Sequence, residues 1–158
     1  MTKAFSTLAA FFACLAICAC SSDSSSATAP TTKTKATCQI TQDSEEAFQI
    51  VITDPDTATI TVTMTYREEI FTTTQTIAFN PDVPQSAIDE ECAETKAEAG
   101  DYIENNIEFD ATCEDGTVSM VTKQASPINP LLFGMTTELA DGCRQIEETG
   151  TVPEDDEN

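Results

Sequence analysis

The sequence feature that most constrains the fold is a strict two-residue alternation over residues 57–66. Threonine occupies every odd position of this segment, and an apolar or aromatic residue occupies every even position. Because successive side chains of a strand point to opposite faces of a sheet, the alternation predicts a strand with one buried face and one hydroxyl-bearing face. The even positions are Ala58, Ile60, Val62, Met64 and Tyr66.

Two further segments beside this strand complete a predicted three-strand meander. Residues 47–53 form a β-rich segment, and Asp54, Pro55 and Asp56 are turn residues that join it to the alternating strand. The polar residues 67–69 make a second break, after which residues 70–79 continue as a third strand. Short connections of this kind favour antiparallel pairing of consecutive strands.

The threonines of the second strand have counterparts on the third, namely Thr72, Thr74 and Thr76. Threonine is a common residue on the exposed face of any strand, so the pattern is explained by a solvated sheet face. Threonine ladders repeated on adjacent strands are also typical of flat faces that bind ice. The same face could alternatively pair with another protein, and the sequence leaves these alternatives open.

A helix is predicted over residues 86–99. Ser86 and Asp89 have the spacing of a capping box, and Gly100 follows as a helix terminator. Ile88, Cys92 and Thr95 fall on one side of this helix and leave it a narrow apolar stripe.

The remaining elements are a hairpin and a second helix. Alternation over residues 107–113 and 118–122, around a short loop at Glu114–Gly116, predicts the hairpin. Asn129 followed by Pro130 predicts a helix start, and Asp141 with Gly142 predicts its end. The expected apolar stripe of this helix is Leu131, Leu132, Met135 and Leu139.

The order of elements predicts an α+β fold with an antiparallel sheet of about five strands. Three-strand meander, helix, hairpin and helix succeed one another, and long polar and apolar alternation implies that the helices cover one face of the sheet. Residues 37–146 have the length of a single domain.

Four cysteines in the predicted domain predict two disulfides: Cys38, Cys92, Cys113 and Cys143. Four cysteines allow three connectivities, of which we favour Cys38 with Cys143 and Cys92 with Cys113. The chain has no histidine and no CxxC pair in this region, so we expect these thiols to hold no metal.

The first nineteen residues have the layout of a secretory signal peptide. Lys3 precedes a small and apolar run from Ala4 to Ala19, which is too short and too abruptly ended for a permanent membrane span. The sequence Ile17-Cys18-Ala19-Cys20 resembles the lipobox of bacterial lipoproteins. The resemblance implies cleavage before Cys20, lipid on that cysteine, and an extracytoplasmic location in the cell envelope.

The resemblance also bears on the membrane and on the segment next to it. Ser21 after the cysteine resembles the signal for sorting to the outer membrane, if the host is Gram-negative. Two or three acyl chains, at about 0.8 kcal/mol per buried methylene, hold a protein durably where one chain does not. Residues 20–36, which are rich in serine and threonine, are expected to form a flexible tether.

The acidic charge restricts the class of partner. Without Lys3, one of seven basic residues, the chain has 6 basic and 28 acidic side chains and a net charge of −22. Such a surface repels nucleic-acid backbones and anionic lipids, so we expect no nucleic-acid partner. Residues 147–158 are acidic and poor in apolar side chains, and we expect them to form a disordered tail.

Candidate chemistry is limited by the absence of histidine. Triads and dyads that use an imidazole base are excluded, and we expect no cofactor and no catalysis. A small envelope enzyme that uses paired carboxylates is one alternative. A calcium-dependent or surface adhesion module is another, although Asp54–Asp56 and Glu114–Asp115 lack calcium-loop spacing and are expected to be turns. The sequence therefore favours a lipid-anchored binding or envelope-associated module.

Overall fold

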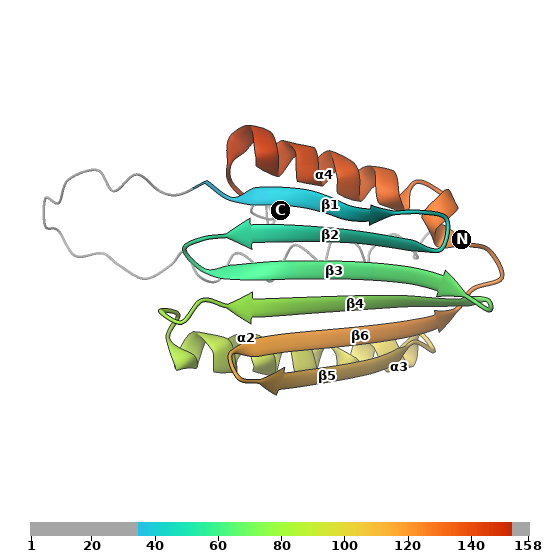
Figure 1. Cartoon of the computed structure of the whole chain (residues 1–158). Coiled ribbons are helices and arrows are strands. Elements are labelled where there is room, and N and C mark those ends of the chain that lie inside the picture. Colours follow the sequence, from blue (N-terminus) through green and yellow to red (C-terminus); the bar gives the residue numbers. More distant parts are fainter. Residues whose placement is uncertain (1–34, 153–158) are drawn as a thin grey trace, which may run out of the picture.

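Residues 35–152, the part of the chain that the computed structural model describes, are built on one six-stranded antiparallel sheet (Figure 1). The order across the sheet is β1-β2-β3-β4-β6-β5. The strands are β1 (Thr37–Asp43), β2 (Ala47–Asp54), β3 (Ala58–Arg67), β4 (Ile70–Phe79), β5 (Glu108–Glu114) and β6 (Thr117–Ala125). The predicted α+β class, meander and hairpin are confirmed.

The sheet has six strands rather than the predicted five, because β1 was not foreseen. This strand lies at the edge of the sheet and pairs with β2. Its only apolar residues are Cys38 and Ile40, of which Cys38 alone is buried, so the two-residue alternation in its sequence is too short to reveal a half-buried strand. Pairing with a long neighbour, which the local sequence does not record, makes this segment a strand.

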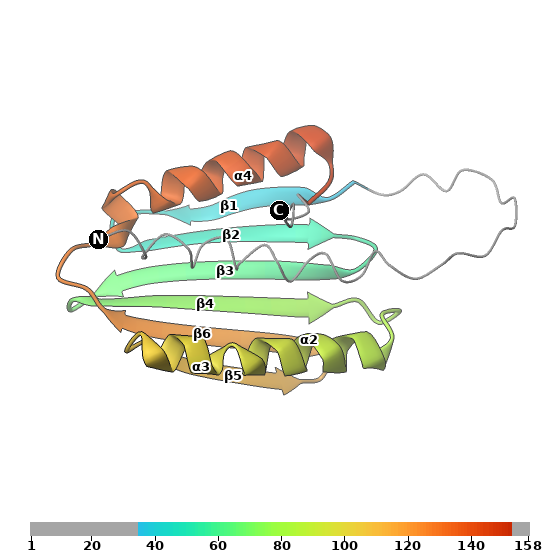
Figure 2. The ribbon, with the colours of Figure 1, turned by 180° about the vertical axis from the view of Figure 1, so that it is seen from behind.

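The helices cover one face of the sheet. Figure 2 shows α4 (Met135–Thr149) over β1 and β2, and α2 (Gln85–Ala97) with α3 (Ala99–Glu104) over β6 and β5. The 3₁₀ turn η2 (Pro130–Leu132) precedes α4. The inner face of β3 and β4 thus lies between two helical covers, and none of the helices formed by residues 35–152 lies on the outer face of the sheet.

The best buried side chains of the main core belong to β2, β3 and α4. Phe48 and Ile50 are 1% and 2% exposed, and Met64 is 2% exposed. Ile146 of α4 is fully buried in the same cluster. Apolar residues of neighbouring strands lie side by side on this face: Ile60 of β3 is opposite Ile52 of β2 and Ile77 of β4.

The predicted limits of the first helix are wrong. Ser86 does not cap it: α2 begins at Gln85, its N-cap residue is Pro84, and no side chain makes a capping bond. The Gln85 side-chain amide donates a hydrogen bond to Asp89 instead. Gly100 lies inside α3 and does not end the helical region, since glycine is tolerated in a helix at a cost of roughly 1 kcal/mol.

The predicted end of the last helix is also wrong. The Asn129 side chain accepts a hydrogen bond from the Leu131 amide and caps η2, as expected from its position before Pro130. However, Asp141 and Gly142 lie within α4, which continues to Thr149. Gly150 ends it in the left-handed conformation that a side chain disfavours.

Several predicted segments lie outside the described residues. They are the signal peptide, Cys20, the tether as far as residue 34, and residues 153–158 of the acidic tail. The first residues of that tail, 147–149, form the last turn of α4. Within residues 35–152, no helix has the length and apolar content needed to cross a membrane.

We predict that Ile146→Ala lowers the free energy of unfolding by about 3 kcal/mol, because the substitution leaves a cavity in the best packed part of the core. Urea denaturation followed by circular dichroism measures the change. Ile103→Ala is the matched control, since Ile103 is 66% exposed on α3, and we expect it to change stability by less than about 0.5 kcal/mol. Equal effects of the two substitutions would contradict the described core.

Candidate functional site

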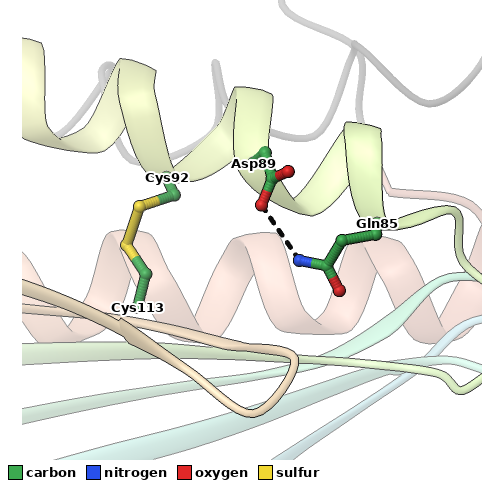
Figure 3. The surroundings of a disulfide bond; sticks show 4 residues. All are labelled: Gln85, Asp89, Cys92 and Cys113. Carbon is green, nitrogen blue, oxygen red and sulfur yellow. Dashed lines mark hydrogen bonds between the residues drawn. A yellow bond between two sulfur atoms is a disulfide. The ribbon is translucent and has the colours of Figure 1, made fainter.

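Two disulfides join the helices to the sheet. Cys38 of β1 is bonded to Cys143 of α4, with a Cα–Cα distance of 5.2 Å. Cys92 of α2 is bonded to Cys113 of β5, with a Cα–Cα distance of 6.0 Å (Figure 3). The favoured pairing of the four cysteines is confirmed. Because β1 and β5 are the two edge strands, each disulfide ties one helical cover to one edge of the sheet.

Cys20, the predicted site of lipidation, lies outside the described residues. The described chain enters the sheet close to the end of α4, where the Ala36 amide donates a hydrogen bond to the Gly150 carbonyl at 2.9 Å. The first described residues, Lys35 and Ala36, therefore lie beside the C-terminal end of α4.

Acidic side chains are abundant but lie mostly at the surface. Glu91 of α2 is the buried carboxylate among residues 35–152, with 7% of its surface exposed, and Thr95 one turn later is also buried. Partial burial raises the pKa of Glu98 above its ordinary value, and the neighbouring carboxylates Asp101 and Glu94 raise it further. This cluster of like charges lies where α2 meets α3.

The two segments weighed as calcium ligands are turns. The Asp54 carboxylate accepts a hydrogen bond from the Asp56 amide at 2.9 Å, which is the bond of an Asx turn. Asp115 and Gly116 both have positive φ, as a tight hairpin turn between β5 and β6 requires. In the described part of the chain, no group of three or more cysteine, aspartate or glutamate residues is arranged to hold a metal ion.

The outer face of the sheet carries an array of hydroxyl groups, which we call the threonine face. On β3 and β4, Thr61 lies opposite Thr76, Thr63 opposite Thr74, and Thr65 opposite Thr72. On β2, Thr53 lies opposite Thr59 of β3, and on β6, Ser119 lies opposite Thr76 of β4, so the array extends to both of these strands. The ladder predicted on one strand therefore repeats in register on β4. On β2, the residues opposite Thr61, Thr63 and Thr65 are Val51, Gln49 and Ala47.

Hydrogen bonds fix part of this face. The Gln49 amide donates to the Thr63 hydroxyl at 2.8 Å, and the Thr76 and Ser119 hydroxyl oxygens lie 3.3 Å apart. No charged side chain occupies the outward positions of β2, nor those of β3 and β4 except Arg67 beside the turn. Although the chain has a net charge of −21, the outward positions of β2, β3 and β4 thus carry no acidic side chain. Charged side chains return on the outward positions of β6 and β5, at Lys123, Glu108 and Asp110.

A second uncovered surface lies on the connection between β6 and α4, and we call it the apolar tip. It consists of Ile128, Leu132 and Phe133, which are 58%, 58% and 68% exposed. Large apolar side chains on a connecting loop are normally few, and an exposed group of them marks a site of interaction.

A shallow depression of about 740 Å³ lies at the β5 edge of the sheet. Its lining comes from the end of α3 and from β5 and β6, and includes Ile103, Phe109 and Val121. Its charged residues are Glu108, Asp110 and Lys123, of which Glu108 and Lys123 are 3.8 Å apart and form an exposed ion pair. Exposed pairs of this kind contribute little energy, and the depression presents no converging set of chemical groups.

Comparison with protein-family models, with curated proteins and with solved structures found no match to this chain.

Sequence reasoning missed the apolar tip for an identifiable reason. Leu131 and Leu132 were both assigned to the apolar stripe of one helix that begins at Pro130. The chain instead makes a 3₁₀ turn, passes through Gly134 in a left-handed conformation, and only then begins α4. Leu131 consequently points into the core at 5% exposure, and Leu132 points outward.

We predict that removing the Cys38–Cys143 disulfide costs more stability than removing Cys92–Cys113. The loops that they close span 105 and 21 residues, and a cross-link restricts the unfolded chain more when its loop is longer. Replacing both cysteines of a pair by serine should lower the free energy of unfolding by about 4–5 kcal/mol for the first pair and about 3 kcal/mol for the second. Guanidinium unfolding measures both values, and the reverse order would contradict this account.

Proposed function

We propose that this chain is a lipid-anchored, extracytoplasmic binding domain that acts without catalysis and presents the threonine face to a partner in the cell envelope. The observation that carries the binding role is the lack of acidic side chains at the outward positions of β2, β3 and β4 on a strongly acidic chain. Charge depletion at the centre of a surface is a compositional mark of protein interfaces.

The disulfides support the proposed compartment. Disulfides of this kind persist in oxidising environments such as the periplasm and the cell surface, and thiols are kept reduced in the cytosol. Both bonds tie helices to edge strands, so they belong to the architecture of the domain. The lipobox-like residues at 17–20 point to the same compartment from an independent part of the sequence.

The geometry of the threonine face supports a flat partner. Its threonine hydroxyl and methyl groups lie in register on the adjacent strands β3 and β4, and Thr63 and Thr76 are already oriented by hydrogen bonds. A surface that is ordered before binding loses little side-chain freedom on association, which favours affinity.

The lipid anchor is tested by metabolic labelling. We predict that a clickable fatty acid fed to cells is incorporated into the wild-type chain and that Cys20→Ala abolishes incorporation, because Cys20 supplies the acceptor thiol. Gel fluorescence after the click reaction measures the label, and Cys18→Ala, which leaves the acceptor in place, is the matched control. Equal labelling of the wild type and Cys20→Ala would refute the anchor.

The threonine face is tested by photo-crosslinking in intact cells. A benzoylphenylalanine introduced at position 61 should give a protein adduct, and we predict that Thr63→Glu lowers its yield at least tenfold, since burying an uncompensated charge in an interface is costly. Ser86→Glu makes the same change of charge on the exposed part of α2. An adduct insensitive to Thr63→Glu, or equally sensitive to Ser86→Glu, would dismiss binding through this face.

The same variants address adhesion to ice, the second use of such a face that the in-register threonine rows favour. Under that function, the purified wild type inhibits ice recrystallisation, Thr63→Glu loses the inhibition, and position 61 gives no protein adduct. Inhibition that is absent in the wild type would dismiss this candidate and leave the protein partner.

A further inference from the structure

The apolar tip is held rigidly although it lies on a connecting segment. The Tyr66 hydroxyl donates a hydrogen bond to the Ser126 carbonyl at 3.0 Å, and the Ser126 amide donates to the Glu69 carbonyl at 2.7 Å. The Asn129 side-chain amide donates to the Glu45 carbonyl at 2.6 Å. Residues 126–129, on both sides of Ile128, are thus bonded to the β1–β2 turn and to the β3–β4 turn.

The rest of the segment is fixed from within. The Asn129 carboxamide oxygen accepts a hydrogen bond from the Leu131 amide, and Leu131 itself is buried in the core. The Phe133 amide donates to the Pro130 carbonyl at 3.1 Å and closes the 3₁₀ turn. Leu132 and Phe133 are therefore presented outward by a fixed backbone, which lowers the entropic cost of burying them against a partner.

The two turns bonded to Ser126 and Asn129, next to the tip, carry negative charge. Glu45 and Glu46 lie in the β1–β2 turn, and Glu68 and Glu69 form the β3–β4 turn, all with exposed side chains. The bonds that hold the segment use the backbone carbonyls of Glu45 and Glu69. The carboxylates of these residues take no part in those bonds and are exposed. Arg67 is the basic residue of the same turn region.

The tip lies at the end of the sheet away from the entry of the chain. Figure 1 shows the start of β1 at one end and the segment before α4 at the other. The Ala36–Gly150 hydrogen bond places the entry beside the C-terminal end of α4, and α4, with its 15 residues, separates the two ends by about 22 Å. This orientation rests on the proposed lipid anchor at Cys20. With that anchor, the tip is directed away from the lipid attachment.

We propose that the apolar tip is a docking surface for a second protein that offers an apolar socket bordered by lysine or arginine side chains. Leu132 and Phe133 fill the socket, and the carboxylates of Glu45, Glu46, Glu68 and Glu69 face its basic border. Exposed aromatic and aliphatic anchors inside a charged rim are the arrangement of interface hot spots. A second copy of this chain brings the same acidic rim and is repelled, and an anionic lipid surface is repelled likewise.

Photo-crosslinking from the tip tests this inference in the anchored protein in its own envelope. Benzoylphenylalanine replaces Ile128, a 58% exposed residue of the tip that is not one of the two socket anchors, and mass spectrometry sorts the products into adducts with another protein, with lipid and with a second copy. We expect one main adduct with another protein. Phe133→Asp should lower its yield about 30-fold, which corresponds to the loss of one hot-spot residue.

The charged rim has its own variant and a matched control. Glu45→Lys combined with Glu69→Lys leaves the backbone bonds in place and should lower the yield at least tenfold. Ile103→Asp removes an apolar side chain of comparable exposure, 66%, from α3 and should leave the yield within twofold. Thermal unfolding of each variant confirms that it is folded.

Each outcome decides between the two proposals. Adducts only with lipid, adducts only with a second copy, no adduct, or a yield unaffected by Phe133→Asp would overturn the inference about the tip. If the tip gives none of the expected adducts and position 61 still does, the binding role stands and the tip is excluded as its site. If the tip adduct is formed and position 61 gives none, the threonine face fails and the tip remains.

Discussion

Each helical cover of this sheet is held by one covalent bond to the strand at its own edge. Cys38 and Cys143 join β1 to α4, and Cys92 and Cys113 join α2 to β5. Edge strands have only one neighbour in the sheet, and β1 buries little beyond Cys38. The disulfides therefore act where apolar burial and strand pairing are weakest, and they hold both helices on the inner face. With the helices fixed there, the outer face stays open.

The sequence allowed the prediction of elements whose pattern is local. The alternation over residues 57–66 predicted β3 because its apolar half meets a core and its threonine half does not. It failed for β1, whose strand character depends on pairing with β2. Local sequence also gave the wrong end for the last helix. Asp141 and Gly142 are typical of a helix end but lie within α4, because packing of Cys143 and Ile146 against the sheet outweighs the weak helix propensity of the two residues.

The threonine face and the apolar tip also differ in how far local sequence predicts them. Threonines on two strands predicted a hydroxyl-bearing face, and only the register of the strands, which sequence does not supply, shows that Thr63 meets Thr74. The apolar tip could not be predicted, because Leu131 and Leu132 are chemically alike and only the turn at Gly134 decides which is buried. Surfaces built from side chains of several segments depend on tertiary structure and are the hardest to derive from a sequence.

The position of Cys38 has a mechanical consequence. Tension applied to the chain ahead of Ala36 enters the domain along β1 and meets a covalent bond at the second residue of that strand. From there the load passes through sulfur into α4, and β1 cannot be peeled from β2 beyond Cys38 unless α4 moves with it. A domain pulled from this end resists as a unit, and the hydrogen bonds between β1 and β2 are spared from bearing the force one at a time.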